Sequence, residues 1–255
     1  MIVFHGTTSG VVDHCRFWRT QSQRRLVLSF HNMARDHELY GYPLSDKWFF
    51  DSGAFSVTTY QAAVLLDHYV QWLLDRKPSI YAALDVLYNG PKSKRNFDLM
   101  LDRGLKPIPV FHPQENFDIL RHYLKYSTWV GIGGLVSGQY RGKLNLDFLD
   151  RCWQIIFETH WPWRIHGFGI NQKQLMLRYP WYSVDSTEAS SSCRYGTNIR
   201  YGPHGQKPTR TTIYQSWTGS LSYCGRFLHS CDELDKLGQF VTKYWEGRGI
   251  EWPSQ

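Results

Sequence analysis

Short apolar runs recur along most of the chain, and several of them end in a polar residue or a glycine. Runs of this kind, bounded by turn-forming residues, are typical of buried strands. In most cases the interval before the next run leaves room for a helix. The sequence therefore predicts eight strands: Ile2–His5, Leu26–Phe30, Trp48–Phe50, Ile80–Leu84, Ile108–Phe111, Trp129–Ile132, Arg164–His166 and Tyr182–Val184.

The segments between these runs follow a different periodicity, in which apolar residues recur every three or four positions. This spacing places them on one face of a helix. Tyr60–Arg76 shows the pattern, and Pro78 marks its end because proline cannot continue a helix. Asn116–Tyr126 and Leu146–Thr159 repeat the pattern, and Asp232–Trp245 predicts a last amphipathic helix.

Strands and helices that alternate at this spacing predict βαβ units and a parallel sheet. Eight such strands favour closure into a (β/α)8 TIM barrel. The competing fold is an open doubly wound sheet with a Gly-x-Gly-x-x-Gly turn, of which Gly131–Gly134 lacks the final glycine. We expect a single α/β domain over residues 1–255. Its barrel should end at about residue 190, followed by an irregular basic extension over 191–255 with a loop and a C-terminal helix.

Polar residues directly follow or end several of the predicted strands. Asp51, Asp85 and Asp185 stand at three strand ends, and His112 and His166 stand at two more. In a parallel barrel the side chains at the carboxyl ends of the strands converge on one mouth, where such folds place their chemistry. We therefore expect these five side chains to meet, with Asp185 as the candidate nucleophile.

The chain is basic, with a formal net charge of +7 and a pI near 9.1. Clustered Lys and Arg side chains gain affinity for polyanions by releasing counterions from phosphates, which favours a nucleic-acid partner. Ser190–Arg210 is rich in Ser, Gly, Arg and Tyr and predicts a long loop. Because this loop follows Asp185 closely, we expect its cations Arg194, Arg200, Lys207 and Arg210 to contact backbone phosphates; the alternative is a solvated surface.

Cysteine usage and hydropathy indicate the compartment. The five cysteines are an odd number without the spacing of a disulfide scaffold, which fits a reducing environment. The N-terminal residues do not resemble a signal peptide, and no run approaches the roughly 18 apolar residues of a membrane span. We expect a soluble, cytoplasmic protein with no membrane partner.

Several motifs resemble, in the same order along the chain, the signatures of tRNA-guanine transglycosylases. The resemblance covers about Leu26 to Thr187. It is closer to the short phage-type DNA 7-deazaguanine transglycosylases of the DpdA type, through Leu84-Asp-Val86, Pro109-Val-Phe-His112 and an Asp-Ser-Thr ending. The shared motifs are Phe50-Asp-Ser-Gly-Ala-Phe55, Trp129-Val-Gly-Ile-Gly-Gly-Leu135, His166-Gly-Phe-Gly169 and Ser183-Val-Asp-Ser-Thr187.

This family exchanges guanine in a polynucleotide for a 7-deazaguanine base through a covalent glycosyl-enzyme. The reaction requires a carboxylate that attacks C1′ of the sugar as the base departs, as in a retaining glycosidase. The resemblance implies that Asp185 is this nucleophile and that Asp51 manages protons on the departing and incoming bases. The alternative for Asp51 is a turn-forming aspartate that precedes Ser52 and Gly53.

The resemblance also assigns residues to the bound base. Asp85 matches the carboxylate that reads the amidine edge of the purine by accepting two N–H donors; the alternative is a cap on the next helix. His112 and Gln114 occupy the position that contacts the base carbonyl, where the family normally has a Gln-Gly pair. Phe55 and His166 match the two stacking walls, and a buried, satisfied histidine is the alternative for His166.

Gly133 and Gly134 match the glycines that let the backbone approach the base, with Leu135 near the 7-substituent. The alternative is a tight turn from strand to loop.

The tRNA enzymes hold a structural zinc through a Cys-x-Cys-x-x-Cys set and a downstream His, a spacing that this chain lacks. We therefore expect no cofactor; the alternative is zinc in an irregular tetrahedral site from Cys193, Cys224, His229 and Cys231.

In the tRNA enzymes the zinc-binding part grips the tRNA, so its absence favours DNA over tRNA as the polynucleotide. The base that replaces guanine would be a 7-deazaguanine such as preQ0. Access to C1′ of a stacked nucleotide requires base extrusion or a single strand. Three alternatives stay open: a tRNA-guanine transglycosylase, a base-releasing nucleosidase or DNA glycosylase, and a non-catalytic nucleic-acid-binding barrel. A phage-encoded enzyme of this kind would act in the cytoplasm of a bacterial host cell.

Overall fold

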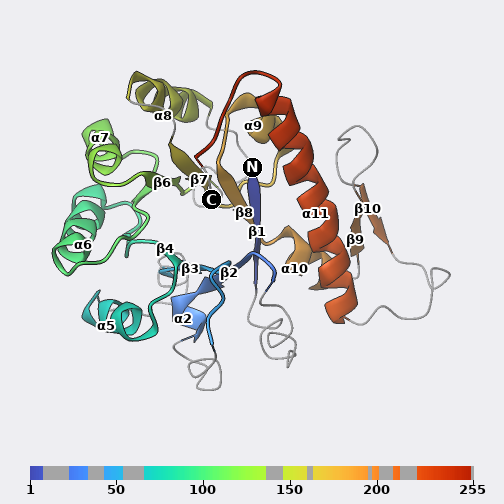
Figure 1. The fold of residues 1–255 in the computed structure, drawn as a ribbon, viewed down its shortest axis with the longest axis horizontal. Helices are drawn as coiled ribbons and strands as arrows, with labels where there is room; N and C mark the ends of the chain where they lie inside the picture. The colour runs from blue at the N-terminus through green and yellow to red at the C-terminus, as the bar shows by residue number, and fades with distance from the viewer. Residues whose placement is uncertain are drawn as a thin grey trace.

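The computed structural model is an α/β fold built on one curled sheet of eight strands (Figure 1). The strand order is β4-β3-β2-β1-β8-β7-β6-β5, and all neighbouring pairs are parallel. The structure describes residues 1–7, 23–33, 43–53, 66–135, 146–159, 163–194, 197–200, 209–212 and 223–253, of which 192–194, 197–200, 209–212 and 223–224 by backbone alone. The eight strands are β1 (Ile2–Gly6), β2 (Leu26–Ser29), β3 (Phe49–Asp51), β4 (Ile80–Tyr81), β5 (Val110–Phe111), β6 (Trp129–Ile132), β7 (Arg164–Gly167) and β8 (Ser183–Ser186).

Helices surround the sheet on its outer side (Figure 1). Within the described part of the chain, no helix is both long enough and apolar enough to cross a membrane. The helices are α2 (Phe30–Met33), α5 (Leu66–Arg76), α6 (Gly90–Asp102), α7 (Phe117–Tyr126), α8 (Leu146–Glu158), α9 (Lys173–Arg178), α10 (Glu188–Arg194) and α11 (Tyr223–Glu246).

Local sequence explains why α6, which the apolar periodicity did not predict, begins where it does. The side chain of Asn89 accepts the backbone N–H of Lys92 at 3.1 Å and so caps the helix. Pro91 occupies the first turn, where a missing N–H costs nothing. The buried side chains of Phe97 and Met100 then fix the helix against the sheet.

Two expectations for the C-terminal region are corrected. The predicted loop Ser190–Arg210 contains the end of α10 and the strand β9 (Thr197–Arg200), which pairs antiparallel with β10 (Thr209–Thr212). Both strands are rich in β-branched residues, which favour extended backbone. The last helix, α11, begins at Tyr223 rather than Asp232, because buried Phe227 and Cys231 extend its apolar face by more than two turns.

Alternating residues of the strands divide between two apolar layers. Outward side chains such as Leu28 and Phe50 pack against the helices in the main core. The inward side chains form a second cluster inside the curl of the sheet, which is why the strands are apolar on both faces. This inner cluster contains Phe4, Val27, Phe49, Ala82, Ile108 and Val110.

The two edge strands of the sheet, β4 and β5, meet at one point. A single parallel bridge pairs Ala82 with Ile108. The N–H of Ala83 donates to the carbonyl of Ile108 at 2.8 Å, and the N–H of Ile108 donates to the carbonyl of Tyr81 at 2.8 Å. The predicted α/β class and eight-stranded parallel sheet are therefore confirmed, and the curled sheet is compatible with a TIM-like fold.

Candidate active site

Three carboxylates gather at the carboxyl ends of the strands. Asp51 ends β3, Asp85 follows β4, and Asp185 lies in β8. Burial, followed by the negative charges of Asp85 and Asp185, raises the pKa of Asp51 from 3.8 to about 7. The three carboxylates, which stand on or just after different strands, thus lie close enough for their charges to interact, as expected from the sequence, while their chemical roles stay predictions.

The turn after β3 fixes the orientation of Asp51. Gly53 has a φ of +85°, and an added Cβ would lie 2.6 Å from Cβ of His31. Glycine is therefore required on two counts, backbone conformation and space. The turn directs the N–H groups of Ser52 and Gly53 at the Asp51 carboxylate, and these hydrogen bonds partly oppose the rise of its pKa.

Asp85 is buried, and both of its carboxylate oxygens have partners within the protein. The hydroxyl of Ser52 donates to Oδ1 at 2.9 Å, and Nε2 of His112 lies 3.1 Å from Oδ2. A purine edge that approached Asp85 would have to displace these partners. Its expected role in base recognition stays a prediction, and in this conformation Asp85 anchors His112.

His112 bridges two carboxylates. Its backbone N–H donates to Oε2 of Glu115 at 3.2 Å, and its Nδ1 lies 3.4 Å from Oε1 of the same residue, a distance for an ion pair rather than a strong hydrogen bond. Burial by itself would lower the pKa of His112, but the contacts with Asp85 and Glu115 outweigh it and raise the pKa to about 9. His112 is therefore a cation at neutral pH, held between two acids.

The two glycines after β6 make room for this imidazole. A Cβ on Gly133 would lie 3.1 Å from Nε2 of His112, and one on Gly134 would lie 3.1 Å from its Cδ2. Gly134 also has a φ of +73°. The glycines expected at the base thus border the His112 ring, while Leu135 is buried in the main core. Gln114 is exposed and has a φ of +72°.

Asp185 is supported by the turn after β7 and by a buried histidine. The N–H of Gly169 donates to Oδ1 of Asp185 at 2.7 Å, and Nε2 of His166 lies 3.3 Å from the same oxygen. Nδ1 of His166 is 2.9 Å from Oγ of Ser183, which fixes the ring. Only 13% of the Asp185 side chain is exposed. This leaves a narrow approach to a carboxylate that is held in place.

His166 has no exposed surface, so its ring lies below the carboxylates and does not offer a stacking face in this conformation. It makes edge contacts with Phe49 at 4.8 Å and Phe168 at 4.4 Å between ring centroids. The ring of Phe168 occupies the space over Gly131, where an added Cβ would lie 2.5 Å from Cε2. The alternative expectation, a buried histidine, agrees with this burial: Nδ1 contacts Ser183, while Nε2 has the ion-pair contact with Asp185 but no hydrogen bond. The stacking role of His166 stays a prediction.

Three residues of the site escaped the sequence analysis. Ser52 and Phe168 stand inside the quoted motifs, and Glu115 lies three residues after His112. The spacing of Glu115 from His112 suits an ion pair on one turn, but carboxylates at such spacings are common on solvated surfaces. Only the burial of both side chains distinguishes this pair.

Several predicted residues fall where side chains are not described. Phe55 and Lys207 lie outside the described residues.

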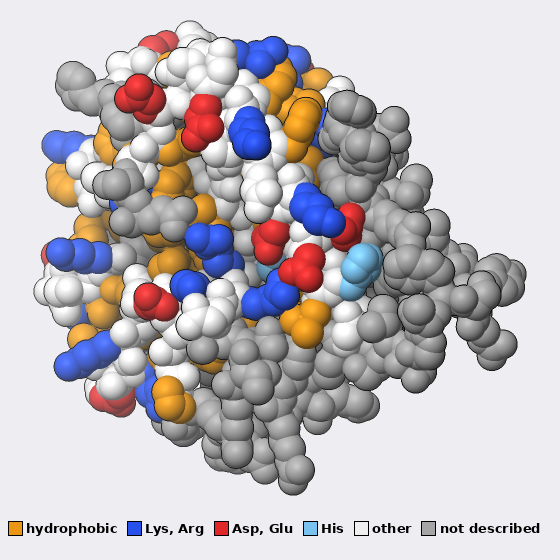
Figure 2. Space-filling model, turned by 45° about the vertical axis from the view of Figure 1, so that its right-hand side comes forward, with side chains coloured by type: hydrophobic (Ala, Val, Ile, Leu, Met, Phe, Trp, Pro, Cys, Tyr) orange, Lys and Arg blue, Asp and Glu red, His pale blue; other side chains and the backbone are white. Residues whose placement is uncertain are grey.

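Figure 2 shows basic and acidic side chains intermixed on the described part of one face. The residues Arg194, Arg200, Arg210, Cys193 and Cys224 are described by backbone alone, on α10, β9, β10 and α11.

The remaining zinc candidates, His229 and Cys231, lie on α11, and Cys231 is fully buried. Over the described ranges, no group of three or more His, Cys, Asp or Glu side chains is arranged to hold a metal ion. The zinc site therefore stays a prediction.

No protein-family model matches this chain, and a search of curated proteins finds no match. The resemblance to transglycosylases thus rests on the motifs alone, and the chemistry has to be judged from the geometry.

Proposed function

We propose that the chain is a (β/α)8 DNA-guanine transglycosylase that replaces guanine in DNA with a 7-deazaguanine such as preQ0. The observation that carries this proposal is the pairing of two carboxyl groups in unlike surroundings. Asp51 has a pKa raised to about 7, so it is half-protonated near neutral pH, and Asp185 receives a backbone N–H at 2.7 Å. These different surroundings suit Asp51 to act as the acid/base and Asp185 to act as the nucleophile.

In the first step, Asp185 attacks C1′ of the deoxyribose. A C1′–O bond forms as the C1′–N9 bond breaks, and the bond electrons leave with the guanine. Protonated Asp51 donates its proton to the departing base, which leaves as neutral guanine. Asp51 is then ionised, and the sugar is held as an ester of Asp185.

In the second step, the incoming 7-deazaguanine loses its N9 proton to Asp51. N9 attacks C1′, the ester bond to Asp185 breaks, and the Asp185 carboxylate is regenerated. Asp51 is again protonated, so the two half-reactions leave the enzyme unchanged. A carboxyl group with a pKa near the working pH serves both directions of proton transfer.

The net charge of +7 supports a nucleic-acid substrate, and the missing zinc motif favours DNA over tRNA as that polynucleotide. Exchange on tRNA and release of guanine to water use the same carboxyl groups. The choice of acceptor and polynucleotide is therefore decided by experiment.

An exchange assay tests the proposal. Labelled guanine or preQ0 is incubated with double-stranded DNA, single-stranded DNA and bulk tRNA, and incorporation is measured for wild type, Asp185→Ala, Asp51→Asn and the control Asp118→Asn. Asp118 lies in the first turn of α7, where its side chain is exposed and pairs with Arg121, so its variant should retain full activity. We expect label in DNA, none with Asp185→Ala, and about 100-fold or greater loss with Asp51→Asn.

Incorporation of label into tRNA alone would show that the enzyme acts on tRNA rather than DNA. Guanine released without incorporation would identify a hydrolase. Full exchange by Asp185→Ala would exclude Asp185 as the nucleophile.

A further inference from the structure

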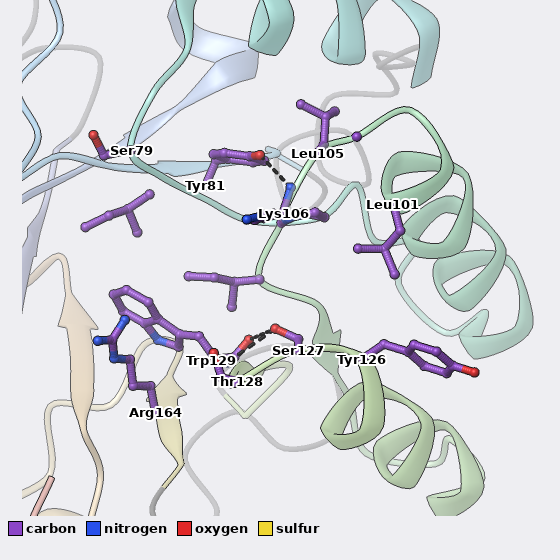
Figure 3. Close-up of a pocket in the computed structure, with 14 residues that line it drawn as sticks. Ser79, Tyr81, Leu101, Leu105, Lys106, Tyr126, Ser127, Thr128, Trp129 and Arg164 are labelled. Atoms are coloured by element: carbon purple, nitrogen blue, oxygen red, sulfur yellow. Dashed lines mark hydrogen bonds between the residues drawn. The ribbon is translucent and has the colours of Figure 1, made fainter. Parts of the chain in front are cut away.

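A cavity lies at the end of the sheet opposite the carboxylates. It has a volume of about 530 Å³ and is bordered by the amino ends of β4, β5, β6 and β7 (Figure 3). The strands β4 and β5 meet only at the bridge between Ala82 and Ile108. The chain segments that precede this bridge on each side, Ser79–Tyr81 and Gly104–Pro107, line the cavity. The opening is thus a consequence of how the two edges of the sheet meet.

The described charged side chains that line the cavity are all cationic. Lys106 and Arg164 line it, and none of the described residues that border it is Asp or Glu. The guanidinium of Arg164 lies over the rings of Trp129 at 5.6 Å and Tyr182 at 5.4 Å from the ring centroids. Such stacking holds the guanidinium in place and reduces the entropy lost when it binds a ligand.

The other walls combine hydroxyl groups with apolar surface. Tyr81 accepts the backbone N–H of Lys106 at 2.8 Å, which fixes the loop that carries this lysine. Ser79 and Thr128 add hydroxyls (Figure 3), and Ile80 and Trp129 add apolar surface. Two cations and hydroxyl donors suit the oxygens of a phosphate group, and the apolar walls suit an attached organic part.

We propose that this cavity binds a small phosphate monoester of about mononucleotide size. A cavity of about 530 Å³ falls within the range of about 300 to 1,000 Å³ typical of small-molecule sites and exceeds what phosphate alone would fill. The proposed exchange chemistry uses none of its residues, and Tyr81 and Asp85 stand at opposite ends of the same strand segment. The site is therefore separate from the carboxylates and does not depend on the proposed function.

Isothermal titration calorimetry with cytidine 5′-monophosphate, inorganic phosphate and cytidine tests this site, because these probes carry no guanine that the carboxylate site would recognise. We expect the monophosphate to bind, phosphate to bind more weakly and cytidine not to bind. Lys106→Gln and Arg164→Gln should each weaken monophosphate binding about tenfold or more, as expected for loss of one charge-assisted hydrogen bond. Lys106 is exposed, so its variant should fold normally even if Arg164→Gln disturbs the stack on Trp129.

Two further variants separate this cavity from the carboxyl end. Lys92→Gln removes an exposed cation from the start of α6, outside the cavity, and should leave binding unchanged. Asp185→Ala should also leave it unchanged, even though it abolishes exchange. Monophosphate binding that survives Lys106→Gln but is lost in Asp185→Ala would overturn the proposal. So would equal binding of cytidine, absence of binding, or binding of a single-stranded oligonucleotide but not of the monophosphate.

Discussion

Replacement of Asp51 by asparagine should stabilise the protein at alkaline pH. Burial, followed by the charges of Asp85 and Asp185, raises the pKa of Asp51 from 3.8 to about 7. The native state therefore holds this proton more tightly than the unfolded chain does. The stabilisation that comes from protonated Asp51 is fully present below pH 3.8, and it is lost as the pH rises through about 7.

The size of the effect follows from the two pKa values. The difference between 3.8 and about 7 corresponds to about 4 kcal/mol of stability lost by pH 8. Because Asp51 is partly exposed, water reduces this figure. The side-chain NH2 group of asparagine would also face the backbone N–H donors of Ser52 and Gly53, which costs about 1 kcal/mol because one donor then lacks an acceptor. We therefore expect Asp51→Asn to be about 2 to 3 kcal/mol more stable than wild type at pH 8.

Urea unfolding at several pH values between 5 and 8 measures this effect. The difference in unfolding free energy between Asp51→Asn and wild type should grow with pH across this window. Asp185→Asn provides the second arm, because removal of its charge should lower the pKa of Asp51 and flatten the pH dependence. A difference that stays constant from pH 5 to 8, or a variant less stable than wild type at pH 8, would refute the electrostatic reasoning.

Three other substitutions test the surroundings of the carboxylates. Glu115→Gln should lower the pKa of His112 from about 9 toward its ordinary value, as followed by NMR titration of the imidazole, and an unchanged titration would contradict the ion pair. Gly133→Ala should destabilise the protein by about 1 to 3 kcal/mol in urea, because the new Cβ would lie 2.9 Å from Cγ1 of Val110; a neutral effect would show that the neighbours move aside easily. Phe168→Ala should cost about 2 to 4 kcal/mol by opening a cavity, and a smaller loss in thermal unfolding would show that its neighbours collapse into the space.

Much of the sheet could be predicted from the sequence because strand formation depends on local patterns. Each of the eight predicted strands overlaps an observed one, and the largest discrepancies lie at short strands such as β4. Polar residues at strand ends converge in any parallel sheet that curls, so Asp51, Asp85 and Asp185 could be placed together without coordinates. The C-terminal region was predicted less well, since its hairpin depends on pairing between two segments that are individually polar.

The sequence by itself determined the class of fold, the order of its strands along the chain and the end of the sheet at which carboxylates gather. Only the tertiary structure decided the protonation of Asp51, the cationic state of His112 and the burial of His166. Hydrophobic periodicity is a property of neighbouring residues, whereas a pKa depends on burial and on charges brought close from other strands. The cavity beside Lys106 and Arg164 has the same origin, because it exists only where the edges of the sheet meet.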